Sequence, residues 1–284
     1  MHDRRRHVAA LILGNLLLVT VCIIVLYPVL WVIKTALAGT ETLQLSALPV
    51  PDKASFGLFQ SVIMAKDAEG RLLFFRQLFN SSIVAAFSTV IGLSLASSAA
   101  YAFSRFMFPG KELGMRALMV TQMFPGVVMS IPLYILLDRV HLLDSLTGLV
   151  LVYSTTSVPF SVWMLKGYFD TIPRDIEEAA FVDGASRWTT FFRIVLPLSK
   201  PALVVTALFS FMNAWNEFIL AATFLGKETM FTLPVQLQRY VGQYNAQWGS
   251  FAAMAILVSI PVMALFFALQ RHLVGGLTSG GVKG

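Results

Sequence analysis

The chain has 284 residues and a formal net charge of +6; 57% of its residues are hydrophobic and only 13% are charged. Soluble domains carry about 25% charged residues, so this composition excludes an ordinary soluble domain and indicates an integral membrane protein. The basic residues are spread over several loops, with no Lys/Arg-rich tract beyond Arg4–Arg6, which argues against nucleic-acid binding.

Six apolar stretches approach or exceed the length of about 20 residues that a helix needs to cross a bilayer. Helices are expected because each span must satisfy its own backbone hydrogen bonds in lipid, and the alternation typical of transmembrane strands is absent. The sequence therefore predicts an all-α integral membrane protein, with one transmembrane domain over residues 1–284. The six predicted spans are residues 8–33, 81–103, 113–137, 146–165, 202–225 and 250–269.

The first predicted span follows a short basic run and could imitate a secretory signal peptide. Its apolar run is far longer than the about 7–15 residues of a signal core, which favours an uncleaved span. Most of the 21 lysines and arginines fall in segments that lie inside if the N-terminus is cytoplasmic. The positive-inside rule then predicts that both termini are cytoplasmic.

The second predicted span has a small side chain at every fourth position, at Ser88, Gly92, Ala96 and Ala100. Such a face lets helix backbones approach closely in lipid, so it predicts a tightly packed internal helix. In the third span, Pro125 predicts a kink because proline cannot donate the helical hydrogen bond.

Charged side chains within the spans are scarce, because a central charge costs about 2.5–3.5 kcal/mol on insertion. Glu217 lies toward the outer end of the fifth span, where it could line a water-filled cavity or cap the helix. Asn213 on the same span and Gln122 on the third are further candidates for lining a cavity.

Motifs for catalysis or cofactor binding are missing. The sequence contains no P-loop, no nucleophile elbow, and no histidine pair with metal-ligand spacing. The chain is therefore predicted not to be an enzyme and to hold no catalytic, cofactor or metal site of its own.

Two sizeable loops are predicted outside. The first, between spans one and two, is expected to contain short interfacial helices. The second, residues 226–249, contains Tyr240, Tyr244 and Trp248. Aromatic residues at such positions are usually interface anchors, and the alternative is a docking surface for an external partner.

The charged stretch between spans four and five, residues 169–200, is here called the central loop. Thr171 can cap a first helix, and Glu177 and Glu178 suit the positive end of its dipole. Gly184 stands where a C-terminal cap would. From the pattern alone, the loop either rests on the bilayer headgroups or is a handle on which something outside the membrane pulls.

After Gly184, Ser186 can start a second short helix that Pro197 ends. The loop thus contains Glu-Ala-Ala, then Gly after three residues, and Ile-x-Leu-Pro after nine more. The positions of this pattern are Glu178, Ala179, Ala180, Gly184, Ile194, Leu196 and Pro197.

This spacing resembles the cytoplasmic loop of permease subunits in binding-protein-dependent ABC importers. Further runs at residues 101–106, 108–111 and 276–284 resemble the carbohydrate-uptake branch, most of all the smaller permease subunit of maltose/maltodextrin transporters. The resemblance implies a multi-pass protein of the bacterial cytoplasmic (inner) membrane, with the central loop as an ATPase-coupling helix.

The resemblance also implies partners. These are a second permease subunit that completes a heterodimer, a cytoplasmic dimer of ATPase subunits that binds ATP and Mg, and an extracytoplasmic sugar-binding protein. Glu178 would face basic or polar groups of the ATPase, and Ala179 and Ala180 would permit close approach. Gly184 would provide the turn, and Leu196-Pro197 would set the exit into span five.

The function predicted in this way is carbohydrate import, of maltose or maltodextrin first, by alternating access coupled to ATP hydrolysis on a partner. Trehalose, another oligosaccharide or glycerol phosphate are alternative substrates, because the spans do not separate them. The larger permease subunit is expected to hold the sugar. A stand-alone secondary carrier is the alternative from another class, although it normally needs ionisable groups near the midplane.

Overall fold

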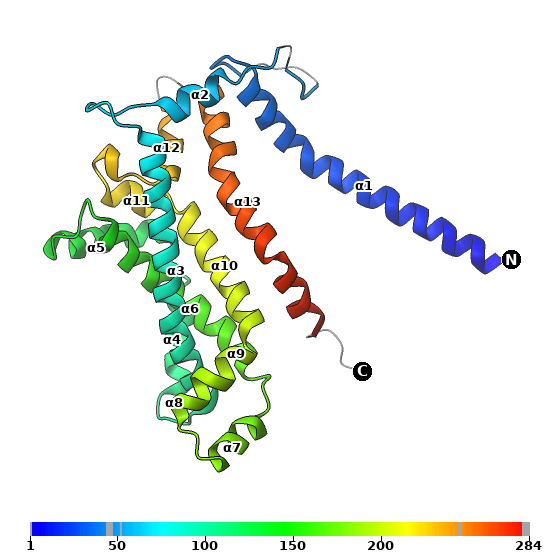
Figure 1. The fold of residues 1–284 in the computed structure, drawn as a ribbon, viewed down its shortest axis with the longest axis vertical. Helices are drawn as coiled ribbons and strands as arrows, with labels where there is room; N and C mark the ends of the chain where they lie inside the picture. Colours follow the sequence, from blue (N-terminus) through cyan, green and yellow to red (C-terminus); the bar gives the residue numbers. More distant parts are fainter. Residues whose placement is uncertain (1, 44–47, 52, 243–245, 280–284) are drawn as a thin grey trace. The chain divides into compact units, whose positions relative to one another are not determined.

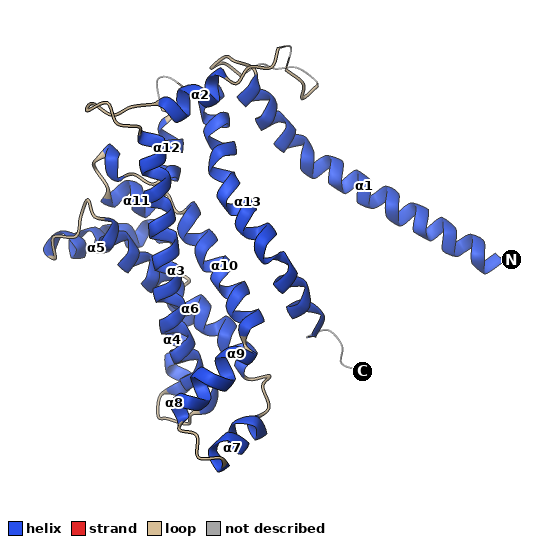
Figure 2. Ribbon diagram, viewed as in Figure 1, coloured by secondary structure: helices blue, strands red, loops and turns tan. Residues whose placement is uncertain are grey.

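The structure is a computed structural model that describes residues 2–43, 48–51, 53–242 and 246–279 (Figure 1). Throughout these ranges the regular elements are helices, and extended pairing is limited to two isolated bridges, Lys66–Leu72 and Val241–Ala246 (Figure 2). The predicted all-α class is confirmed. Of the residues named above, Tyr244 and the end of the tail, residues 280–284, lie outside the described residues.

The helices follow the predicted order along the chain. They are α1 (His2–Leu37), α2 (Gly57–Met64), α3 (Leu73–Arg105), α4 (Lys111–Thr121), α5 (Gly126–Arg139), α6 (Leu146–Phe169), α7 (Arg174–Val182), α8 (Arg187–Thr190), the π-helix η1 (Phe191–Val195), α9 (Leu196–Leu198), α10 (Lys200–Asn216), α11 (Ile219–Phe224), the 3-10 helix η2 (Glu228–Met230), α12 (Leu233–Arg239) and α13 (Trp248–Ser279). Two compact units divide the chain: Met1–Phe74 with Leu237–Ser259, and Phe75–Gln236 with Ile260–Gly284.

Four helices of the described chain are long and apolar enough to cross a membrane: α1, α3, α6 and α13. Two bent pairs raise the number to six if each pair is one span. In the first pair, α4 and α5 meet at 100°; in the second, the stretch Arg187–Leu198 meets α10 at 78°. The multi-pass architecture agrees with the prediction, and the kink predicted at Pro125 is present between α4 and α5. The predicted fifth span, residues 202–225, is not one helix, because α10 ends at Asn216 and α11 begins at Ile219.

The break between α4 and α5 and the break between α10 and α11 both have local causes. α4 ends at Thr121, and Pro125 precedes α5 with φ −58° and ψ 131°, outside the helical region. Proline has no N–H to donate and pushes the residue before it out of the helix, so the chain turns here. α10 ends at Asn216 because Glu217 is extended, and its carboxylate accepts hydrogen bonds from the N–H groups of Leu220 and Ala221, which starts α11.

In the first unit, one carboxylate holds the start of α13. Glu41 accepts hydrogen bonds from the Ser250 N–H at 2.9 Å and from the Ser250 hydroxyl at 2.6 Å. Gly249 is required beside it, because an added Cβ would lie 2.3 Å from the Thr40 carbonyl oxygen. The predicted helix between the first two spans is present as α2.

In the second unit, α3 packs along α6 through the small-residue face identified in the sequence. Ser88, Ala96 and Ala100 are buried, and the Ser88 hydroxyl donates to the Val150 carbonyl at 3.4 Å. At Gly92, an added Cβ would lie 2.4 Å from the Ser157 hydroxyl oxygen and 3.3 Å from the Ser154 carbonyl oxygen, so a larger residue would force the Ser157 side chain to move. The small residues therefore bring the two backbones together, and this contact supports the core of the second unit.

Apolar side chains fill two clusters of the second unit. One surrounds Leu149, Tyr153 and Phe224, and joins α3, α5, α6 and α11. The other surrounds Phe169 and Phe191, and joins the end of α3 to α6, η1 and the central loop. The second cluster fastens the central loop to the ends of two long helices.

Candidate functional site

The central loop begins as α6 ends. The Thr171 hydroxyl donates to the Tyr168 carbonyl at 2.7 Å, so it closes the last turn of α6. The predicted capping of the next helix by Thr171 is therefore wrong. The Thr171 hydroxyl bonds the carbonyl three residues earlier, and no side chain caps the start of α7. Pro173 stands at the N-cap of α7, with φ −56° and ψ 134°.

The turn after α7 follows the prediction. Gly184 has φ +85°, and its N–H donates to the Phe181 carbonyl at 3.0 Å, while the Ala185 N–H donates to the Ala180 carbonyl at 2.9 Å. This pair of bonds is a Schellman motif, which needs a residue that tolerates positive φ. Ser186 then caps α8 by accepting a hydrogen bond from the Thr189 N–H at 3.2 Å.

The inner face of α7 is held by a buried ion pair. The Glu177 carboxylate accepts hydrogen bonds from the Arg105 guanidinium at 2.5 Å and from the Tyr101 hydroxyl at 2.8 Å. The side chains of Arg105 and Glu177 are only 7% and 5% exposed. We call Tyr101, Arg105 and Glu177 the clasp. A buried carboxylate needs such partners, so the clasp ties α7 to the end of α3.

A second set of hydrogen bonds extends the clasp toward α6. Arg105 also donates to the Ile172 carbonyl and to Ser104 Oγ, and the Ser104 hydroxyl donates to Asp170 at 2.6 Å. Lys166 donates to the other carboxylate oxygen of Asp170 at 2.6 Å. Burial disfavours the charged form of Asp170, but hydrogen bonds from Lys166 and Ser104 outweigh this and hold its pKa below the ordinary value.

The outer face of α7 is exposed. Glu178 and Ala179 point away from the core, whereas Ala180 is buried beside Glu177. Val182, four residues after Glu178 and so on the same face, is 87% exposed. Glu178 forms no ion pair within the described ranges. The three residues of the Glu-Ala-Ala pattern are therefore divided, with the first two outside and the third inside.

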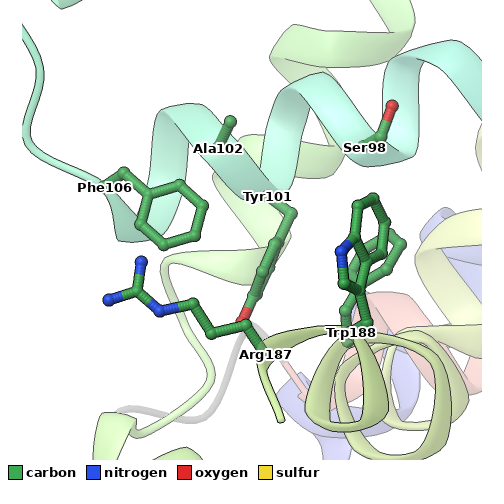
Figure 3. A pocket seen from close by; sticks show the side chains of 7 residues that line it. Ser98, Tyr101, Ala102, Phe106, Arg187 and Trp188 are labelled. Carbon is green, nitrogen blue, oxygen red and sulfur yellow. The ribbon is translucent and has the colours of Figure 1, made fainter.

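The second half of the central loop packs some of its side chains into the apolar cluster around Phe169. Leu196 and Ile194 are half-buried, Pro197 is exposed, and the fully buried Val195 anchors η1 in the cluster around Phe169. A small hollow of about 300 Å³ lies between α3 and α8. In its lining, the Arg187 guanidinium lies 4.9 Å from the centre of the Phe106 ring. Figure 3 shows this hollow, with Tyr101 extending from α3 toward α8.

Two of the three predicted cavity residues come together. Gln122, at the end of α4, and Asn213, on α10, line the same two adjoining hollows of about 270 and 480 Å³. Glu217 is occupied elsewhere, because it caps α11 and accepts a hydrogen bond from the Tyr153 hydroxyl at 2.5 Å. Of the two alternatives for Glu217, its bonds are those of a helix cap.

The clasp was not singled out from the sequence. Tyr101 and Arg105 are four residues apart, so they share one face of a helix end, and Arg105 is a lone cation after a long apolar run. Glu177 looks equivalent to its neighbour Glu178 in the sequence. The signal that could have separated them is their position around the helix. Glu177 and Ala180 are three residues apart and share the buried face of α7, whereas Glu178 lies on the exposed face.

A family model decides the wider classification. The model for the inner membrane component of binding-protein-dependent transport systems matches residues 88–279. The chain belongs to this family. The matched range of this transport component includes the clasp, both faces of α7 and the two hollows.

Three relatives align with nearly the whole of this chain. It is 35% identical over 261 residues to the trehalose transport system permease protein SugB of Mycobacterium tuberculosis (91% of this chain, 93% of the relative). It is 34% identical over 281 residues to the galactooligosaccharides permease protein GanQ of Bacillus subtilis (99% and 98%). It is 35% identical over 289 residues to the maltose/maltodextrin permease protein MalG of Escherichia coli K12 (97% and 97%).

A solved structure supports the fold. A bacterial ABC transporter involved in the import of the acidic polysaccharide alginate contains a chain that superimposes with a TM-score of 0.77 at 22% identity. The match covers 92% of this chain and 95% of that chain. The helical fold described above is therefore shared with that chain.

Proposed function

We propose that the chain is the permease subunit of an ATP-driven carbohydrate importer, and that α7 is the helix on which the ATPase subunit acts. The observation that carries this proposal is the division of α7 into two faces. Its inner face is tied to α3 by a buried ion pair, while its outer face leaves Glu178 and Val182 exposed. A nine-residue helix held from within and open on the outside suits a partner that pushes on it.

The clasp suggests how such a push reaches the membrane. A buried ion pair with additional hydrogen bonds moves as one body, so a displacement of α7 is passed to the end of α3. α3 in turn approaches α6 closely at Gly92. α6 and α10 line the hollows that contain Gln122 and Asn213. Closure of the partner ATPase would thus change access to those hollows, which is alternating access.

The proposal assigns the remaining components to other chains. ATP and Mg bind to a dimer of ATPase subunits in the cytoplasm, because this sequence has no P-loop. A second permease subunit completes a heterodimer, and an extracytoplasmic binding protein delivers the sugar. The Lys and Arg distribution favours cytoplasmic termini and a cytoplasmic central loop in the inner membrane of a bacterium.

For the substrate, we propose maltose and maltodextrins. The support is an identity of 41% over 213 residues with the maltose/maltodextrin permease protein MalG of Vibrio vulnificus, covering 73% of this chain and 72% of the relative. Trehalose and galactooligosaccharides are the rival substrates, because relatives with these names are 35% and 34% identical.

The test is to purify the chain from its own cells through an affinity tag and identify what accompanies it. We expect a second permease and an ATPase subunit, and stimulation of ATP hydrolysis in liposomes by a maltose-loaded binding protein. Recovery of the chain alone, or solute movement by the purified chain without ATPase, would count against the proposal. Stimulation only by trehalose or a galactooligosaccharide would replace the substrate and leave the rest intact.

A further inference from the structure

The two hollows beside α6 share part of their lining. Gln122, Thr156 and Asn213 line both, so the smaller hollow of about 270 Å³ adjoins the larger one of about 480 Å³. The larger lies in the range of about 300–1,000 Å³ that small-molecule sites occupy. α4, α6 and α10 all contribute to this wall, although they are distant in the sequence.

The polar groups of this wall are neutral. The lining of the two hollows contains hydroxyl and amide side chains and no Asp, Glu, Lys or Arg. The Gln122 side-chain N–H donates to the Thr156 carbonyl at 3.2 Å, which orients its amide. Asn213 is exposed and makes no side-chain hydrogen bond within the described residues, so its amide can both donate to and accept from a ligand.

Two aromatic rings stand next to these amides. Phe160 on α6 and Phe209 on α10 meet edge to face, with ring centres 6.1 Å apart. They are 40% and 50% exposed, so their ring surfaces are open to a ligand. Flat aromatic surfaces accept the C–H faces of a pyranose ring, and adjacent amides and hydroxyls bond its hydroxyl groups. Rings and neutral amides together are the chemistry that recognises an uncharged sugar.

We propose that this wall is a sugar-contacting site, in which Phe209, Phe160, Asn213 and Gln122 bind uncharged carbohydrate during its passage. The site lies on this chain itself, so the chain takes part in substrate selection and does not merely complete a cavity wall. An anionic ligand such as glycerol phosphate is disfavoured, because no cation in the lining replaces the water that its charge loses. The inference rests on the proposed transport function and deepens it.

The test uses the intact complex in proteoliposomes. The sugar-loaded binding protein is added outside the liposomes, and ATP is enclosed inside them. The variants are Phe209→Ala and Asn213→Ala, with Phe209→Leu as a milder second variant. Phe267→Ala is the matched control, because Phe267 is an exposed ring on α13 outside both linings. Uptake of radiolabelled maltose, trehalose and glycerol 3-phosphate is measured beside stimulated ATP hydrolysis and the yield of assembled complex.

We expect maltose or trehalose uptake to fall about tenfold in Phe209→Ala and Asn213→Ala, while assembly and stimulated ATP hydrolysis stay within about twofold of wild type. Phe267→Ala should transport normally, and wild type should not transport glycerol 3-phosphate. Normal sugar uptake by the Phe209 and Asn213 variants would overturn the inference. Equal loss of uptake and of assembled complex in Phe209→Ala, Phe209→Leu and Asn213→Ala would also overturn it, since the wall would then be a subunit contact. A wild-type complex that moves no sugar would instead refute the proposed function.

Discussion

Replacing Glu177 by Gln should release α7 from α3. The change keeps the side-chain size but leaves the Arg105 guanidinium, only 7% exposed, without its counter-charge. Breaking a buried ion pair costs about 3–5 kcal/mol. The lower end applies here, because Arg105 keeps hydrogen bonds to the Ile172 carbonyl at 3.0 Å and to Ser104 Oγ at 3.1 Å. A loss of about 3 kcal/mol corresponds to a change of about 100-fold in the opening equilibrium of α7.

Hydrogen exchange of the α7 amides measures that equilibrium directly. A nine-residue helix is marginal on its own, so its protection must come from the contacts of its inner face. In Glu177→Gln we expect exchange of these amides to accelerate by about 100-fold, while the amides of α10 stay as in wild type. Asp175→Asn is the control, because this exposed acid in the same first turn should cost only about 0.3–1 kcal/mol. Acceleration of less than about threefold in Glu177→Gln would refute the clasp as the anchor of α7.

Three further predictions concern the central loop. Glu178→Lys should lower the amount of co-purified ATPase at least about tenfold by reversing a charge on the outer face, with α7 exchange unchanged; normal co-purification would contradict this. Gly184→Ala should destabilise the complex by about 1–2 kcal/mol through strain at φ +85°, and Gly184→Pro by more, whereas Gly167→Ala in open space on α6 should not; equal melting temperatures for the Gly184 and Gly167 variants would refute the strain. Because the pKa of Asp170 is held below 3.8, its stabilisation is full above that pH and is lost as pH falls through the lowered value. Asp170→Asn should therefore lose less thermal stability than wild type as the pH is lowered below 3.8, and parallel losses would disprove this.

Local chemistry explains which parts of the loop were predictable. The turn at Gly184 and the cap at Ser186 depend on residues within three or four positions of each other, so the sequence alone predicts both. The number of apolar stretches likewise indicates the multi-pass class. Thr171 was mistaken for a cap because two acceptable hydrogen bonds compete at that position, and only the geometry of α6 decides between them.

Long-range pairing explains what was not predictable. Glu177 and Glu178 are chemically identical neighbours, and what distinguishes them is Arg105, 72 positions earlier in the chain. Similarly, Glu217 could be read as a cavity residue because its partners, the Leu220 N–H and the Tyr153 hydroxyl, become visible only once α10 is seen to stop at Asn216. The break between α4 and α5 was signalled by Pro125, but the 100° bend was not.

The central claim is that the clasp carries the signal between the ATPase and the membrane helices. The most direct test is the ratio of ATP hydrolysis with and without the sugar-loaded binding protein, measured on assembled Glu177→Gln complex in liposomes. We predict that basal hydrolysis and subunit composition stay as in wild type, while stimulation by the loaded binding protein disappears. Stimulation equal to that of the wild-type complex would contradict the account.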